Sequence, residues 1–283
     1  MDVFHTRYGD LTNEQVNELY RSDTWEGLSH GERLDALQEL ENRSAVELGN
    51  KPCEVMLKPM EGAYGAYQDG GRIYLNKSLV ETGDLVVHNE NGDVLASFHP
   101  DDTNAQLMDT IHHENYHAYQ YEAINGIVNH ENAAEVEQWK ANWPVEKYIR
   151  ANDPEHCYRL QSVEKSAFSN GEAQTKRAFE AIEAKYGIDA GYQSYLESIS
   201  ENSFEHELEQ AQAITGDANI ENSVNQRMLD NYQASIGHDS SINSMTQIDS
   251  LTSADTTNQA GLITTPSVTD IVTNFSDDLE DCL

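Results

Sequence analysis

The feature that most constrains this chain is a histidine-rich stretch near its middle, at residues 111–119. The stretch contains the pattern H-E-x-x-H: His113 and His117 are four residues apart, and Glu114 directly follows the first histidine. On an α-helix, residues four apart lie one turn apart on the same face. Two imidazole nitrogens placed in this way converge on a single metal ion, at about 2.0–2.1 Å from each. The pattern therefore indicates a metal-binding helix, which the rest of the fold has to accommodate.

The sequence around the motif favours such a helix. Leu107, Ile111 and Ala118 recur at helical spacing, and neither glycine nor proline interrupts the pattern before Gly126. In this setting the motif is typical of zinc hydrolases, in which the two histidines bind Zn²⁺ and the glutamate acts as general base. The alternative is a polar helix whose histidines face solvent. His112 is a weaker ligand candidate, because the residue four positions after it is a tyrosine.

A catalytic zinc ion needs a third protein ligand, and we predict Glu164 in this role. The stretch Asp153-Pro154-Glu155 has a favoured N-cap residue and a proline at the first helical position, which predicts a helix from there to about Ser169 and a stop at Asn170-Gly171. Its buried side is marked by Leu160, Val163, Ala167 and Phe168. Glu164 lies in the same arc, and a buried carboxylate costs several kcal/mol unless a positive or hydrogen-bonding group meets it. A zinc ion would be such a group.

Other arrangements around Glu164 are open at the level of sequence. The side chain can tilt outward, or form an ion pair with Arg159 or Lys165. Rival ligands that lie on no clearly inward-facing stripe are His130, Glu131, Glu135, Glu155 and His156. Cys157, two helical turns before Glu164, would give a closed His-His-Glu-Cys site, which suits structural zinc rather than catalytic zinc.

Charge and composition argue against several classes of function. The chain has 17 Lys and Arg against 50 Asp and Glu, a formal net charge of −33. Such an acidic protein repels phosphate groups, so nucleic-acid binding is not expected. No apolar run approaches the roughly 20 residues that span a bilayer, and the N-terminus lacks the features of a secretory signal. The cysteines at positions 53, 157 and 282 predict no disulfide framework, and we expect synthesis in the reducing cytoplasm.

The periodicity along the chain predicts an α+β fold. Besides the two site helices, helices are expected at residues 12–24, 29–49, 132–142, 172–186 and 189–214. Strand patterns occur at residues 53–57, 63–67, 72–75, 85–88 and 94–98. They predict a small, mostly antiparallel sheet packed on the metal-binding helix. An edge strand there either holds a peptide substrate in extended form by main-chain hydrogen bonds or only shields the metal.

The C-terminal part differs in character from the rest. Beyond Gly216 the chain is rich in Ser, Thr, Asn, Gln and Asp, and Arg227 is the only Lys or Arg after residue 200. Apart from a short helix near residues 221–235, we expect this tail to be largely disordered. It is interpreted as a solubilising tail, or alternatively as an export or chaperone-recognition segment used by a non-classical route.

Together, these residues resemble a known family. The string His113-Glu114-x-x-His117 followed by Glu164-x-x-Ala167 resembles the gluzincin group of zinc metallopeptidases. The longer pattern, with Trp139-x-x-Asn142 and Tyr158-x-x-Gln161 before Glu164, is similar to compact metallopeptidase domains of bacterial polymorphic toxins and effectors and of phage or mobile-element proteins. The resemblance covers roughly residues 29–185 and implies zinc bound by the two histidines and Glu164, with Glu114 as general base.

The resemblance also implies a domain division and a reaction. We expect an N-terminal helical extension at residues 1–28, a zincin-like metallopeptidase domain at 29–215 and the tail at 216–283. The G-A-M-E-N signature of exopeptidases is absent, which favours an endopeptidase acting on protein or peptide substrates. Tyr158 and His156 are the candidates for stabilising the transition state.

Two questions are left open by the sequence. The aspartate that often follows the family's glutamate motif is replaced by Ala167-Phe168, so the group that orients a zinc-binding histidine is unidentified. The competing function is a non-catalytic metal-binding or protein-interaction module with a structural zinc site. An inhibitor or a secretion chaperone would be a further partner of a toxin-like protein.

Overall fold

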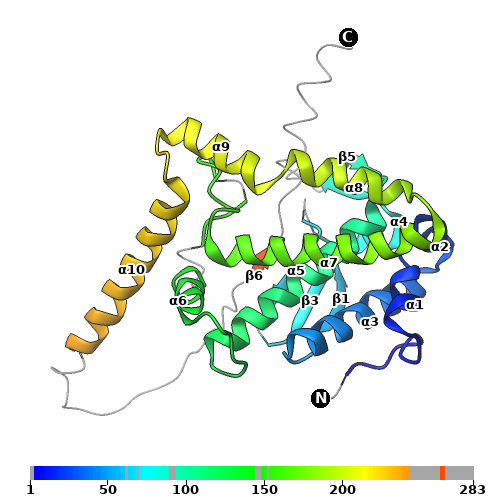
Figure 1. Ribbon diagram of the computed structural model, residues 1–283, viewed down its shortest axis with the longest axis horizontal. Coiled ribbons are helices and arrows are strands. Elements are labelled where there is room, and N and C mark those ends of the chain that lie inside the picture. The colour runs from blue at the N-terminus through cyan, green and yellow to red at the C-terminus, as the bar shows by residue number, and fades with distance from the viewer. Residues whose placement is uncertain are drawn as a thin grey trace, which may run out of the picture.

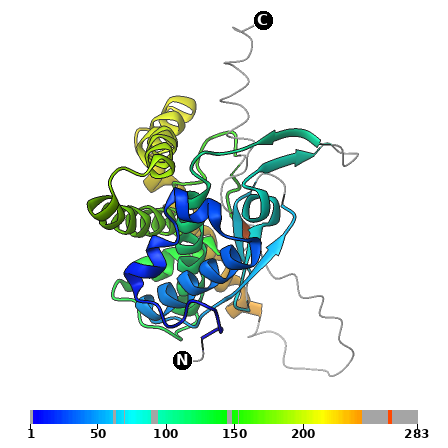
Figure 2. The same cartoon turned by 90° about the vertical axis from the view of Figure 1, so that its right-hand side faces the viewer.

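The computed structural model describes residues 3–60, 63–68, 70–88, 94–143, 148–151, 153–242 and 262–264. Within these ranges the chain has the predicted α+β class (Figure 1). In the view of Figure 2 most helices lie on one side and the strands on the other. None of the helices in the described ranges combines the length and the apolar character that a membrane crossing would need.

Helix α5, Thr103–Ile124, is the central element and carries the H-E-x-x-H motif, as predicted. It packs against α7 (Ser162–Tyr186), α3 (His30–Leu48) and the sheet. Most of its residues are buried, polar ones included, because neighbours surround it on nearly every side. Buried polar groups need hydrogen-bond partners, so the elements packed around α5 have to supply donors and acceptors for its polar side chains.

Helix α3 begins and ends where the sequence predicts. The Ser29 hydroxyl accepts a hydrogen bond from the Glu32 amide at 3.4 Å, and the Glu32 side chain accepts one from the Ser29 amide at 2.9 Å. Gly49 closes the helix with a φ of 82°, a left-handed conformation that favours glycine.

The single helix expected at residues 12–24 is instead two short helices, α1 (Asn13–Glu18) and α2 (Ser22–Gly27). The break allows Tyr20 and Trp25, both buried, to stack with ring centroids 5.1 Å apart. Aromatic packing against the core therefore outweighs the continuation of the helix.

The predicted strands form two sheets rather than one. The larger sheet contains β1 (Glu54–Lys58), β2 (Gly65–Gln68), β3 (Arg72–Asn76) and β6 (Leu262–Thr264). The order of these strands across the sheet is β1-β3-β2-β6. β1 and β3 are parallel, and the other two pairs are antiparallel. Helix α4 (Lys77–Thr82), which was not predicted, leads to the separate hairpin β4 (Leu85–His88) and β5 (Val94–Phe98), which projects in Figure 2.

The helix expected at residues 153–169 begins later, at Ser162. The Asp153 carboxylate and carbonyl accept hydrogen bonds from the amides of Cys157 and His156, which closes a turn instead of a helix. Helix α7 obtains its N-terminal partners from distant residues: Asn142 accepts from the Val163 amide, and Asn225 from the Ser162 amide. The local start signal is therefore overridden by tertiary contacts.

Helix α7 also continues through Asn170-Gly171, so the two helices expected at 153–169 and 172–186 are one. Gly171 is required by close packing, because a Cβ atom there would lie 2.3 Å from Oδ1 of Asp109 on α5. Asn170 donates to the carbonyl of His112, which ties the same two helices together. The glycine is a helix–helix contact and not a helix end.

The remaining helices include one that the sequence placed in the disordered tail. α6 (Ala133–Asn142) agrees with the prediction, whereas the expected helix 189–214 is divided into α8 (Ala190–Glu201) and α9 (Phe204–Thr215) by the capping residue Ser203. α10 (Ile220–Ile242) extends the short predicted helix, and its Ile220, Val224 and Met228 pack with Leu160 in a buried cluster. The packed part of the chain therefore continues past residue 215. The disorder predicted for 243–261 and 265–283 lies outside the described residues.

Candidate metal centre

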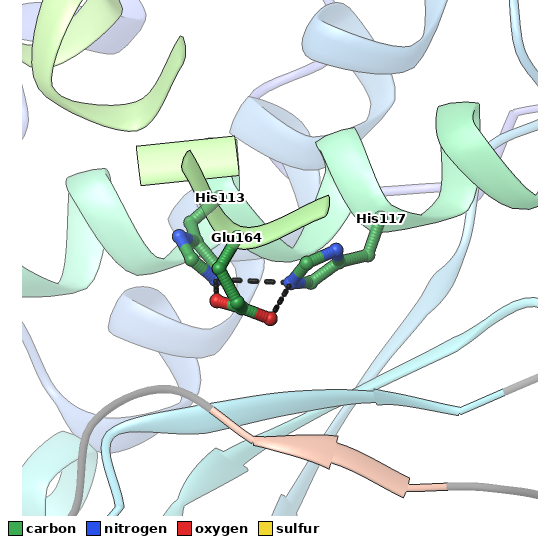
Figure 3. Close-up of side chains that lie close together, drawn as sticks. All are labelled: His113, His117 and Glu164. Atoms are coloured by element: carbon green, nitrogen blue, oxygen red, sulfur yellow. Dashed lines mark hydrogen bonds and ion pairs between the residues drawn. The ribbon is translucent and has the colours of Figure 1, made fainter. Parts of the chain in front are cut away.

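His113, His117 and Glu164 converge in the interior, as Figure 3 shows. The two histidine Nε2 atoms are 3.0 Å apart, and the Glu164 carboxylate oxygens lie 3.5 Å from Nε2 of His113 and 3.3 Å from Nε2 of His117. All three side chains are at most 1% exposed. The structure thus brings the three predicted ligands together from α5 and α7, across more than forty residues of sequence.

The donor set fits a metal ion. Ligand atoms held tetrahedrally at 2.0–2.1 Å from an ion lie about 3.3 Å from one another, close to the spacing of these atoms. Oε2 of Glu164 is buried and has no hydrogen-bond partner among the described residues. Two imidazoles and one carboxylate are a typical zinc donor set, and within the described part of the chain no fourth acidic, thiol or imidazole group joins them.

Gln120 fixes the orientation of His117. The Gln120 side-chain amide donates to the carbonyl of Val163 at 2.8 Å and to Oγ of Ser166 at 2.9 Å, so its oxygen faces Nδ1 of His117, 2.8 Å away. Nδ1 must then carry the proton, which leaves the lone pair of Nε2 directed at the cluster when the ring is neutral. Gln120 is therefore the orienting partner that the sequence did not identify.

The electrostatics of the cluster favour a positive charge at its centre. Burial alone would raise the pKa of Glu164, but the charge of His117 and the close approach of both histidine rings lower it well below its usual value. Burial lowers the pKa of His113 to about 4. Against the effect of burial, the Glu164 carboxylate raises the pKa of His117. A buried carboxylate thus stays ionised and requires a cation, which a proton on His117 or a metal ion supplies.

Glu114 lies next to the cluster and is fully buried. Its Oε2 accepts a hydrogen bond of 2.6 Å from the Tyr67 amide on β2, and its Oε1 has no partner among the described residues. Burial raises the pKa of Glu114 to about 8, and the Glu164 carboxylate adds to this effect. The β2 strand comes so close because Gly65 has no side chain: a Cβ atom there would lie 2.6 Å from Thr110 Cγ2 on α5.

Glu164 is supported by a second group of residues, which precedes α7. The Tyr148 hydroxyl donates to Oε1 of Glu164 at 2.6 Å, and the Tyr158 hydroxyl lies 3.3 Å from that of Tyr148. Gln161 exchanges two hydrogen bonds with the backbone of Ile149, which fixes the position of the neighbouring tyrosine. Burial, together with Glu164, raises the pKa of both tyrosines, so both hydroxyls remain protonated donors.

The two predicted transition-state residues differ in position. Tyr158 is buried, and its hydroxyl lies 3.3 Å from that of Tyr148 and interacts with the Glu164 carboxylate itself. His156 is exposed and has a φ of 53°, and no contact of the described chain brings it to the ligands. Tyr148, which sequence analysis missed, also contacts Glu164 directly. No spacing signal connects it to the motif, whereas Gln120 is three residues after His117 and could have been found on the same helix face.

The alternative arrangements considered for Glu164 are not present. Arg159 pairs with Glu172 at 2.8 Å, and Lys165 pairs with Glu221 at 2.6 Å. Cys157 lies in the buried cluster with α10, outside the ligand group, so the closed four-ligand site is wrong. The physical reason is the late start of α7, because Cys157 is not on the same helix as Glu164.

The rival ligands are also separate from the centre. Nδ1 of His130 is 2.9 Å from the Tyr119 hydroxyl, and its Nε2 is 3.1 Å from Glu135. His112, the weaker ligand candidate, forms a buried hydrogen bond of 2.8 Å with Ser44 and is not part of the ligand group.

Comparison of the chain with protein families, curated proteins and solved structures finds no match. The resemblance to gluzincins therefore rests on the residues of the site alone.

Proposed function

We propose that this protein is a zinc metallopeptidase of the gluzincin type, acting as an endopeptidase on protein or peptide substrates. The observation that carries the proposal is the convergence of His113, His117 and Glu164 beside the buried carboxylate of Glu114. A purely structural metal would not need a carboxylate with a raised pKa at its side. A general base next to the metal is what hydrolysis requires.

Each residue then has a defined part in the reaction. His113, His117 and Glu164 would hold the zinc ion, which would supply Lewis-acid polarisation of the scissile carbonyl and would make water more acidic. Glu114 takes the proton of the attacking water and delivers it to the leaving amine. Burial raises the pKa of Glu114, which makes its carboxylate a stronger base, and the positive charge of a bound zinc ion would keep that carboxylate ionised until it meets the attacking water.

The hydrogen bond from β2 holds Glu114 in place for this work. Because the Tyr67 amide donates to Oε2, Oε1, which has no partner among the described residues, is the oxygen better placed to exchange a proton. Tyr148 and Gln120 are positioning residues: the first orients Glu164 and the second orients His117. Both act through a ligand, as the outer partners of zinc ligands commonly do.

Metal analysis combined with a digestion assay tests the proposal. We expect one zinc per chain in the wild type and in Glu114→Gln, and no stoichiometric zinc in His113→Ala or Glu164→Ala. Only the wild type should cleave casein or a peptide library. His130→Ala is a matched control, because this histidine lies outside the ligand group, and it should retain both zinc and activity. Undiminished cleavage by Glu114→Gln, or a zinc-loaded wild type that cleaves nothing, would contradict the proposal.

A further inference from the structure

Strand β2 has an edge that lies beside the metal centre. The Asn76 amide donates to the Tyr64 carbonyl, and the register then pairs Gly65 with Leu75 and Tyr67 with Ile73. In an antiparallel ladder, hydrogen-bonded pairs alternate with pairs that are not. The backbone groups of Gly65 and Tyr67 therefore point away from β3, and the Tyr67 amide indeed donates to Glu114. A peptide pairing with this edge would run past the general base.

This edge is occupied by a segment of the chain itself. β6, residues 262–264, pairs antiparallel with β2, and the register places Ile263 opposite Tyr67. Figure 3 shows β6 as the salmon strand that runs below the three ligand side chains. The segment is remote in sequence from the rest of the sheet, whose other strands lie before residue 77. It thus joins the sheet from outside, as an added peptide does.

We propose that residues 262–264 are an internal inhibitor that occupies the peptide-binding edge of β2, and that a substrate has to displace them. The inhibitory role of residues 262–264 rests on the proposed peptidase function, but their pairing with β2 can be tested without catalysis. A tethered segment competes at an effective concentration of the order of millimolar. Three residues of pairing make few hydrogen bonds, so a longer extended substrate can replace the segment.

A disulfide lock tests the pairing directly. The register pairs Gln68 with Leu262, and by the same alternation this pair is not hydrogen-bonded. Such pairs have Cα atoms about 4.5 Å apart, within the range that a disulfide spans. In the full chain, Gln68→Cys combined with Leu262→Cys should form an intramolecular crosslink on mild oxidation, detected by mass spectrometry. Gln68→Cys alone, which adds no second thiol in the register, is the matched control and should form no such crosslink.

A peptide-binding experiment tests, without catalysis, whether residues 262–264 occupy the edge of β2. Ile263→Pro removes the amide that faces Tyr67 in the register, and proline is poorly tolerated in a strand. In the Glu114→Gln background, a fluorescent peptide of residues 258–268 should bind the Ile263→Pro chain at least tenfold more tightly than the chain without that change. Ile263→Val, which keeps the backbone amide opposite Tyr67, should bind like the parent. Equal affinity for all three chains would overturn the inference.

Hydrolysis then separates this inference from the proposed function. With an active Glu114, Ile263→Pro should lower KM several-fold with kcat unchanged, and the locked disulfide should abolish cleavage until a phosphine reductant is added. If the crosslink and the peptide binding are found but no chain cleaves peptides, the inference stands and the peptidase proposal fails. If the wild type cleaves peptides while neither the crosslink nor a change in KM is found, the inference fails and the peptidase proposal stands.

Discussion

At the scale of single residues, the centre depends on groups that never touch the metal position. Gln120 is one of them, because three hydrogen bonds fix its amide and thereby set the tautomer of His117. Tyr148 has the same relation to Glu164. A ligand that is free to rotate binds a metal more weakly than one that is already oriented.

We therefore predict that Gln120→Leu weakens zinc binding by about 10- to 100-fold, since the Nδ1 proton of His117 loses its acceptor. Gln120→Glu keeps the acceptor and should lose less. Competition with a chromophoric zinc chelator measures both affinities. Equal zinc affinity in Gln120→Leu and the wild type would show that Gln120 does not orient His117.

Glu41 is a second buried carboxylate, which lies behind the motif helix and outside the ligand group. Its Oε1 accepts hydrogen bonds from the Cys53 amide at 2.6 Å and from the Asn115 side chain at 2.9 Å. Burial outweighs these bonds and raises the pKa of Glu41 to about 8. The folded chain therefore keeps this carboxyl protonated at a pH at which the unfolded chain has released the proton.

This shift predicts a pH dependence of stability. Below about pH 4.5 both states are protonated and Glu41 contributes its full stabilisation. As pH rises towards 8, only the unfolded state loses the proton, so the free energy of unfolding falls by up to about 1.4 kcal/mol per pH unit. Glu41→Gln stays neutral and should flatten this slope between pH 5 and 8. Urea unfolding with a chelator present measures the slope, and Glu47→Gln, exposed on the same helix, is the control.

At the scale of elements, the contact between β2 and α5 links the sheet to Glu114, the proposed general base. It depends on Gly65, whose missing side chain leaves room for Thr110 Cγ2. We predict that Gly65→Ala destabilises the protein by about 1–3 kcal/mol, as overpacking does. It should also lower activity more than it lowers zinc content, because the Tyr67 amide moves away from Glu114.

A double-mutant cycle identifies the cause. Thr110→Ser removes Cγ2 and keeps the hydroxyl that donates to the Gln106 carbonyl at 2.7 Å. In this background Gly65→Ala should cost about 1 kcal/mol less, measured by denaturant unfolding. Gly27 is the control for glycine replacement, because a Cβ atom there would have no neighbour within 4 Å. Additive losses from the two changes would show that Thr110 is not the obstacle.

The elements also show which parts of the molecule local sequence determines. Helix α3 follows its own capping signals, and the motif helix follows its own periodicity, so both were predicted well. The start of α7 was not predicted correctly, because Asn142 and Asn225 accept the hydrogen bonds of its first amides, and no local pattern reveals these partners. Gly171 was misread as a stop signal for a related reason: its role is set by Asp109, about sixty residues away in sequence.

The same distinction applies to the site. His113, Glu114 and His117 are recognisable together because a single helix spaces them, and Glu164 was found because it interrupts an apolar stripe. Tyr148 and the Tyr67 amide could not be found, since only the tertiary fold brings them to the ligands. The proposed ligands and the proposed base were therefore predictable, and most of the groups that orient them were not.

At the scale of the whole molecule, the helices after residue 200 complete the environment of the centre. Helix α10 packs on α6 and α9, and its Asn225 caps the helix that carries Glu164 (Figure 1). Lys165 and Glu221 join the same two helices by an ion pair of 2.6 Å. A polar, acidic sequence thus contributes to the folded body wherever a few apolar residues, such as Val224, reach the interior.

The net charge of −33 makes the stability of the whole chain sensitive to ionic strength. Acidic side chains outnumber basic ones 50 to 17, so they repel one another in the compact state more than in the unfolded state. Salt shortens the Debye length from about 30 Å at 0.01 M to about 8 Å at 0.15 M. We predict that this change raises Tm by at least 2–4 °C, equivalent to about 1 kcal/mol for a chain of this size. Differential scanning calorimetry in NaCl, with sucrose of equal osmolality as the uncharged control, measures the effect. A Tm that falls with NaCl would mean that attractive ion pairs such as Arg159–Glu172 outweigh the repulsion.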